Sequence, residues 1–161
     1  HELKTLTRNY QKHTRLHRSH HYVISGPAGP TYFVKECQAY ESPSDPSKSS
    51  IELVHDEVSS NSMLMTNFTP YAPSQMTDCS PTTKTCKLST LYAFHFKDSD
   101  RVTLQCTIEV CRSSNVAACQ AQASNGVTTG RKKRDDGLQR HVLQSTIIVY
   151  DHVMDTDFKT A

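Results

Sequence analysis

The sequence predicts an all-β protein, and three observations support this class. Residues 102–110 alternate without a break between apolar and polar side chains, which is typical of a half-buried antiparallel strand. Ser, Thr, Val and Tyr are frequent, whereas stretches with a helical apolar period are few. Hydrophobic residues make up 35% of the 161 residues and there is no Trp, so we expect a modest core in one domain.

The stretch from Leu88 to Cys119 organises the rest of the chain. Residues 88–96 and 102–110 are interpreted as two strands joined by a polar turn, that is, as an antiparallel hairpin. Cys106 lies on the apolar face of the second strand. We therefore expect this strand to tie one sheet to another.

Shorter strands are expected before the hairpin, separated by turns rich in Gly, Pro and Ser. They cover residues 22–24, 31–39, 51–55 and 62–68. Residues 69–87 are expected to form a long loop, which a local bridge between Cys79 and Cys86 would hold.

The segments at the two ends of the chain are less regular. Residues 1–21 are basic and histidine-rich, and we interpret them as a solvated linker or tail rather than as a metal site built from His13, His17, His20 and His21. Residues 112–140 are expected to form a loop and residues 142–150 a hydrophobic strand, within a propeptide-like segment 135–161 that ends in a polar tail.

The cysteines and two short motifs indicate an oxidising compartment. Six cysteines permit fifteen pairings, and their spacing fits disulfides better than a zinc site. Asn67-Phe68-Thr69 is an acceptor triplet for N-glycosylation. The basic run Arg131, Lys132, Lys133 and Arg134 has the form of a processing site for a furin-like protease.

Two function classes are disfavoured by the sequence. The formal net charge of +2 is too small to indicate a nucleic-acid-binding surface over the whole chain. No nucleophile-elbow or HExxH motif is present, so we expect no enzymatic activity, no metal and no cofactor.

Together these residues resemble the C-terminal half of the zona pellucida (ZP) module, ZP-C, over residues 22–150. One carrying motif is Val-x-Leu-x-Cys-x-Ile-x-Val-Cys over residues 102–111, with a further cysteine at Cys119. A second is the aromatic strand Tyr32-Phe33-Val34 that leads to Cys37-Gln38-Ala39. The third is the basic cluster followed by a hydrophobic strand, which is similar to the cleavage site and external hydrophobic patch of the family.

The resemblance implies an immunoglobulin-like β-sandwich over residues 22–130, stapled by disulfides. It implies bridges from Cys37 to Cys106 across the sheets and from Cys111 to Cys119. Family members usually have a later cysteine that this chain lacks, so Cys79 is assigned to Cys86. The blocking strand would consist of Val142, Leu143, Ile147, Ile148, Val149 and Tyr150.

The resemblance also implies a function. The chain is expected to be part of a secreted matrix glycoprotein from a membrane-anchored precursor, with the anchor outside residues 1–161. It would polymerise with other ZP modules in an egg coat, cuticle or apical matrix once the blocking strand is released. In an egg coat, sperm or matrix proteins would be candidate partners. The alternative is a receptor or co-receptor ectodomain that binds a protein ligand.

Overall fold

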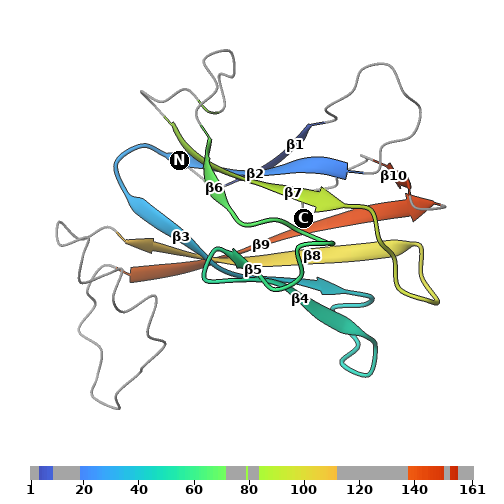
Figure 1. Cartoon of the computed structure of the whole chain (residues 1–161). Helices are drawn as coiled ribbons and strands as arrows, with labels where there is room; N and C mark the ends of the chain where they lie inside the picture. Colours follow the sequence, from blue (N-terminus) through green and yellow to red (C-terminus); the bar gives the residue numbers. More distant parts are fainter. Residues whose placement is uncertain are drawn as a thin grey trace, which may run out of the picture.

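The computed structural model describes residues 4–8, 19–71, 79, 84–111, 138–150 and 153–155. All long regular elements in this part of the chain are β-strands, and no helix there is long and apolar enough to cross a membrane. The strands form two sheets stacked on each other (Figure 1). The all-β prediction is therefore confirmed.

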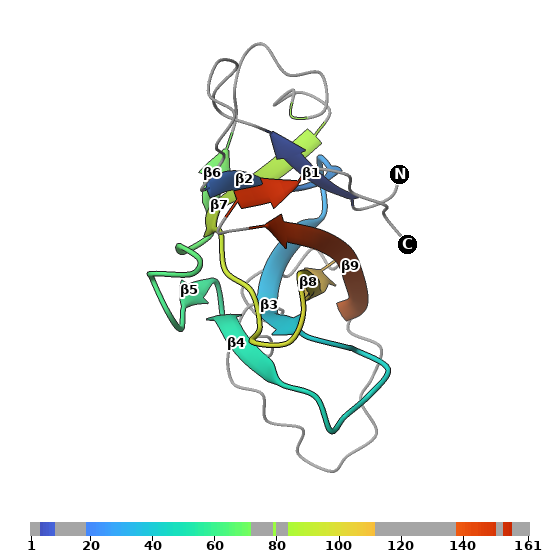
Figure 2. The same ribbon diagram turned by 90° about the vertical axis from the view of Figure 1, so that its right-hand side faces the viewer.

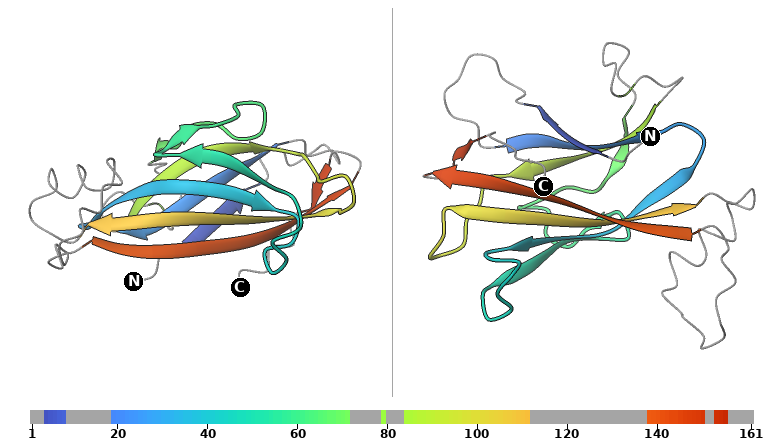
Figure 3. Two further views of the ribbon diagram at one scale, coloured as in Figure 1. Left: turned by 90° about the horizontal axis from the view of Figure 1, so that it is seen from below. Right: turned by 180° about the vertical axis from the view of Figure 1, so that it is seen from behind.

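The first sheet has four strands and the second has six, and all neighbours are antiparallel. In spatial order the first sheet contains β1 (Lys4–Arg8), β2 (Ser19–Pro27), β7 (Lys84–Tyr92) and β6 (Thr69–Tyr71). The second contains β10 (Val153–Asp155), β9 (Leu138–Tyr150), β8 (Arg101–Cys111), β3 (Thr31–Tyr40), β4 (Ser50–His55) and β5 (Val58–Ser59). Figure 2 shows the two layers end on, and Figure 3 shows β4, β3, β8 and β9 side by side.

The core lies between the sheets and follows from the alternation in the sequence. β8 contributes its apolar face, on which Leu104 and Ile108 are fully buried. The first sheet contributes Tyr22 and Ile24 from β2 and Leu91 from β7. The apolar face of β8 was the strongest prediction from the sequence, and it is confirmed, because its apolar positions from Val102 to Val110 are all buried. The opposite face departs from a period of two, since Thr103 and Glu109 are buried as well.

The expected hairpin between residues 88–96 and 102–110 is wrong. Both segments contain strands, but β7 belongs to the first sheet and β8 to the second. Residues 93–100 cross between the sheets, and Phe94 and Phe96 pack against the core there with their rings in an edge-to-face contact. Two strands that each have one apolar face bury more of it when they face each other than when they lie side by side.

Four smaller expectations are also corrected. The segment 1–21 is not only a tail, because it contains β1 and the beginning of β2. Residues 62–68 form turns with one isolated bridge, from Met65 to Leu91, instead of a strand. The segment 69–87 contains β6 and the first residues of β7, and the segment 151–161 contains β10. Most of these strands lie at sheet edges, where hydrogen bonds from a partner strand replace an apolar period of their own.

The disulfide between Cys37 and Cys106 has the expected partners but lies in an unexpected place. The two residues are directly opposite each other on β3 and β8, with their Cα atoms 4.1 Å apart. The bond therefore joins two neighbouring strands of one sheet, and the expected tie across the sheets is wrong. Register decides this, because adjacent antiparallel strands bring facing Cα atoms within disulfide reach.

The other cysteines among the described residues are oxidised as well. Cys79 is bonded to Cys86, with Cα atoms 5.6 Å apart, and both pack against Val23 in a small second cluster. Cys111 is also disulfide-bonded, whereas Cys119 lies outside the described residues.

A tight turn joins β4 to β5 within the second sheet and contacts the first sheet through the Glu57 side chain. Asp56 and Glu57 have positive φ angles of 49° and 65°, a backbone conformation that costs energy for residues other than glycine. Glu57 accepts a hydrogen bond from the Val34 amide at 3.1 Å and forms an ion pair with Lys87 of β7. The Lys87 ammonium also lies 5.2 Å from the centre of the Phe33 ring. These contacts offset the strain of the turn.

Candidate functional site

β9 is the outermost long strand of the second sheet, and it covers the edge of β8. The two strands pair at eleven positions, from Arg101 opposite Ile148 to Cys111 opposite Leu138. Among the described strands, β10 pairs with β9 at residues 148–150 alone. β9 therefore occupies backbone groups of β8 that would otherwise form a free sheet edge. We call the contact between these two strands the β8–β9 seam.

The residues predicted for the blocking strand all lie on β9 and are divided between its two faces. Ile147 and Val149 are 2% and 3% exposed and belong to the core, and Leu143 packs partly buried against it. Val142 is 61% exposed and Ile148 is half-buried. For Tyr150 the structure describes the backbone, which pairs with Val153. Burial of Ile147 and Val149 stabilises the seam by about 1.5–3 kcal/mol each.

Polar side chains form a ladder on the outer face of the seam. Gln105 Nε2 of β8 donates a hydrogen bond to Gln144 Oε1 of β9 at 2.8 Å. The hydroxyl groups of Thr103 and Thr146 are 3.3 Å apart. Such directly opposed pairs stabilise one register over another, because a slip by two residues breaks all of them at once.

Glu109 forms the third rung of this ladder and is buried. It is 1% exposed, and it is the one carboxylate buried to this degree in the described part of the chain. Arg140 Nε of β9 donates to Glu109 Oε1 at 3.0 Å, while Glu109 Oε2 is buried without a hydrogen-bond partner in the structure. The Arg140 side chain is 60% exposed. Because a buried carboxylate is costly when it loses its counter-ion, Glu109 depends on a cation from the strand beside it.

The inner face of the seam contains a buried phenol. The Tyr22 hydroxyl of β2 lies beside Ser145 of β9 and Thr5 of β1, without a hydrogen bond of good geometry to either. Burial raises the pKa of Tyr22 to about 12, and the two neighbouring hydroxyls oppose this rise. The Thr5 and Ser145 oxygens are 3.3 Å apart and link β1 to β9 across the sandwich.

The predicted cleavage site lies in the connection between the two strands of the seam. β8 ends at Cys111 and β9 begins at Leu138, and Arg131, Lys132, Lys133 and Arg134 are outside the described residues between them. No cysteine follows Cys119 in the sequence. A cut after Arg134 would therefore leave no peptide bond or disulfide between β9 and the preceding residues 1–134 within this sequence.

The predicted glycosylation residue lies at the other side of the sandwich. Asn67 is exposed and follows β5, where the chain passes from the second sheet to the first. Its Oδ1 accepts a hydrogen bond from the Ser59 amide at 2.8 Å. A glycan on Asn67 would lie away from the β8–β9 seam, because β5 and β9 are on opposite sides of β3, β4 and β8.

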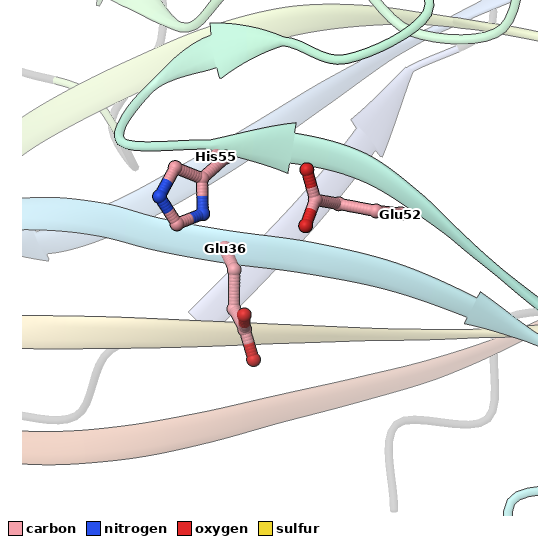
Figure 4. A group of neighbouring side chains, drawn as sticks. All are labelled: Glu36, Glu52 and His55. Atoms are coloured by element: carbon pink, nitrogen blue, oxygen red, sulfur yellow. The ribbon is translucent and has the colours of Figure 1, made fainter.

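One group of side chains has the donor set of a metal site. Glu36 of β3 and Glu52 and His55 of β4 have ligand atoms within 4.8 Å of one another (Figure 4). A bulge in the β3–β4 pairing makes this possible, since Leu53 and Val54 both face the core and residues 52 and 55 then share the outer face.

Protein groups already engage two members of this group. His55 Nε2 is 3.2 Å from the Asp56 carboxylate, and Glu52 accepts a hydrogen bond from the Ser60 hydroxyl at 2.6 Å. Both Glu52 and His55 are exposed. The group is therefore assigned to surface ion pairs and hydrogen bonds.

The histidines considered as metal ligands in the N-terminal segment do not form a site in the described structure. His20 and His21 are neighbours on β2, and adjacent strand residues face opposite sides of a sheet. His20 is 2% exposed and His21 is half-buried. His13 and His17 lie outside the described residues.

No model of a known protein family matches this chain, and no curated protein matches it.

The residues that the sequence did not reveal as functional are Glu109 and Arg140. The alternation of β8 placed Glu109 on the solvent face, and its burial depends on Phe33 and Arg140 standing opposite it on the neighbouring strands.

Proposed function

We propose that this chain is a structural extracellular module of the ZP-C type, which assembles into filaments or a matrix after β9 is released. One observation carries the proposal. β9 begins at Leu138, shortly after the basic cluster 131–134, and it covers the edge of β8 over eleven paired positions.

The order of the strands supports an immunoglobulin-like sandwich. With β1 to β9 taken as strands A, B, C, C′, C″, D, E, F and G, the first sheet has the order A-B-E-D. The second has the order G-F-C-C′-C″, as in immunoglobulin variable-type domains. The disulfide differs, because Cys37 and Cys106 join strands C and F rather than B and F.

In this proposal β9 acts as a lock on the edge of β8. While β9 is paired, the N–H and C=O groups on this edge of β8 are hydrogen-bonded to β9 and cannot bind a strand from another molecule. After the cut and the departure of β9, β8 presents an open edge that can accept an incoming strand. Donation from one molecule to the next in a head-to-tail manner does not close on itself, so it extends into a filament.

Cleavage and release are two separate steps in this proposal. Ile147, Val149 and the polar ladder still hold β9 after the covalent connection is cut. Release then requires a second event that competes with these contacts. The cut thus makes the release of β9 possible, and the departure of β9 then exposes the edge of β8 for assembly.

The proposal includes a compartment and partners. Bonded cysteines persist in oxidising surroundings, which fits a secreted protein that passes a furin-like protease. The partners are other ZP modules, with sperm or matrix proteins as further candidates in an egg coat. The assembly needs no cofactor.

Electron microscopy of the cleaved protein tests the proposal. The full chain is treated with a furin-like protease, the peptide 135–161 is removed, and samples are imaged before and after removal. We expect filaments only after removal, and none from a control in which Arg131 to Arg134 are replaced by Ala. A chain that stays monomeric after losing β9 would refute polymerisation, and binding of a growth factor by that monomer would favour the receptor alternative.

A further inference from the structure

β8 and β9 contain similar ten-residue segments. Residues 101–110 read RVTLQCTIEV and residues 140–149 read RHVLQSTIIV, and six of the ten aligned positions are identical. The identical pairs are Arg101/Arg140, Leu104/Leu143, Gln105/Gln144, Thr107/Thr146, Ile108/Ile147 and Val110/Val149. Two core-facing positions of β8 differ: Cys106 aligns with Ser145, which is also small, and Val102 aligns with the exposed His141.

The seam is centred on equivalent residues of this repeat. Gln105 stands opposite Gln144 in the β8–β9 register, and these two residues are equivalent in the alignment. An antiparallel pair of like strands centred in this way has an approximate two-fold axis. The axis passes between the two glutamine side chains, which are hydrogen-bonded at 2.8 Å.

We infer that, once β9 has left, the edge of β8 pairs with β8 of a second copy of this chain, antiparallel and two-fold symmetric about Gln105. The inference rests on the proposed release of β9. It goes beyond it by naming the strand that takes the vacated place and the register in which it binds.

All three rungs of the polar ladder are retained in such a pair. Gln105 meets Gln105 of the second copy, and Thr103 meets the Thr107 that corresponds to Thr146. Glu109 meets the Arg101 that corresponds to Arg140. The buried carboxylate thus regains the cation that it loses with β9, and symmetry provides this contact twice.

The spacing of the ladder singles out this segment. The seam requires a basic residue, an amide four positions later and a hydroxyl six positions later, as in Arg140, Gln144 and Thr146. Among the 18 Lys and Arg residues of the chain, the one other that begins such a pattern is Arg101, followed by Gln105 and Thr107. No other segment of the chain offers the same complement to β8.

The pairing has one structural requirement and one consequence. Thr5 of β1 contacts Ser145 across the sandwich at 3.3 Å, so β1 has to move when a second copy brings its own first sheet to this place. A two-fold contact uses the same surface on both partners and therefore closes after two copies. The β8–β8 pair is a dimer that competes with filament growth.

Cysteine cross-linking at the two-fold axis tests the inference. Gln105→Cys places the new thiol directly opposite the same thiol of the second copy. This pair is of the close, non-hydrogen-bonded type. Cys106 forms a close pair with Cys37 of β3, with Cα atoms 4.1 Å apart, and the pair type alternates both from residue to residue and between the two edges of a strand, so residue 105 forms the close pair on the other edge. After cleavage and removal of β9, we expect covalent dimers linked through residue 105, mapped by mass spectrometry. Thr107→Cys is the matched control. It is also half-buried on the outer face, but its own copy lies about 13 Å away along the strands.

A charge reversal provides the second readout. Arg101 is exposed and stands opposite Ile148 in the uncleaved chain, so Arg101→Glu should leave the precursor folded. In the dimer it would place a carboxylate against Glu109 of the second copy, and we expect dimer affinity to fall by about 10- to 100-fold. Lys97→Glu makes the same charge change outside the strand and should leave the dimer unchanged.

The outcomes separate this inference from the proposed function. Dimers linked at residue 105, absent with Thr107→Cys and weakened by Arg101→Glu, support the β8–β8 pair. Release of β9 followed by filaments or monomers without this link overturns the inference and leaves the proposed release intact. Retention of β9 by the cleaved protein under all non-denaturing conditions overturns both.

Discussion

Replacing Ile147 by Ala should weaken the hold of β9 on the sandwich far more than replacing Val142 by Ala. Ile147 is 2% exposed within the core, whereas Val142 is 61% exposed on the same strand. Truncation of a buried Ile to Ala costs about 2–5 kcal/mol, because apolar contacts are lost and a cavity remains. An exposed substitution usually changes stability by less than about 0.5 kcal/mol.

The energetic cost of Ile147→Ala is expected to appear in two measurements. In the uncleaved chain, Ile147→Ala should lower the free energy of unfolding in urea by about 3 kcal/mol. In the cleaved chain the same loss falls on the bound peptide, and about 3 kcal/mol corresponds to roughly a 100-fold weaker hold. Gel filtration with mass analysis of the peptide fraction, at rising urea concentrations below the unfolding transition, measures this release.

Comparison of the two variants decides the outcome. If the peptide leaves the Ile147→Ala and Val142→Ala proteins at the same urea concentration, the core contacts of β9 do not hold it. The backbone hydrogen bonds to β8 would then hold β9, and the assignment of this hold to the burial of Ile147 and Val149 would fail. If Val142→Ala alone releases the peptide, the assigned faces of β9 are wrong.

Three other predictions address the fold and its surface. Loss of the Cys37–Cys106 bond, which spans a sequence separation of 69, should cost about 4 kcal/mol in urea unfolding, against about 2 kcal/mol for Cys79–Cys86 with its separation of 7. Since the pKa of Tyr22 is raised from 10.0 to about 12, the folded state holds its proton more tightly than the unfolded state. Stability should therefore be lost as pH rises from 10 to 12, by up to about 3 kcal/mol from this group. In pH-dependent unfolding Tyr22→Phe should reduce this slope, while Tyr32, whose pKa is also raised by burial, retains its own contribution. Protein expressed through a secretory pathway should lose glycan mass with either Asn67→Gln or Thr69→Ala, and Asn67→Gln alone should also lower stability, by about 1 kcal/mol, because Asn67 Oδ1 accepts the Ser59 amide.

The strands with a clear period were predictable from the sequence, whereas their neighbours were not. β3 and β8 have alternation that any antiparallel sheet would require, so local residues suffice to find them. The polar turn before Arg101 is compatible both with a hairpin and with a crossing between sheets. The choice depends on which apolar faces can be buried together, and this is a property of the whole chain.

The candidate site also combines features that the sequence predicts with features that it does not. The hydrophobic run of β9 and the basic cluster before it were visible in the sequence. The burial of Glu109 was not, because a carboxylate on the polar side of an alternating strand is normally in water. The Cys37–Cys106 pairing followed from a resemblance, but its place within one sheet required the register of β3 against β8.

The position of the Cys37–Cys106 bond has a consequence for how the domain bears mechanical load. A pull along β8 is passed directly to β3 through a covalent link in the plane of the sheet. The contact between β8 and β9 has no such link among its described pairs and relies on hydrogen bonds that a pull along the strands would shear together. Under tension, a cleaved domain that still holds β9 would therefore yield at this edge strand and keep the centre of the sheet intact. Stretching would act as a further way to expel β9, and single-molecule extension would detect it as a short first step before the domain unfolds.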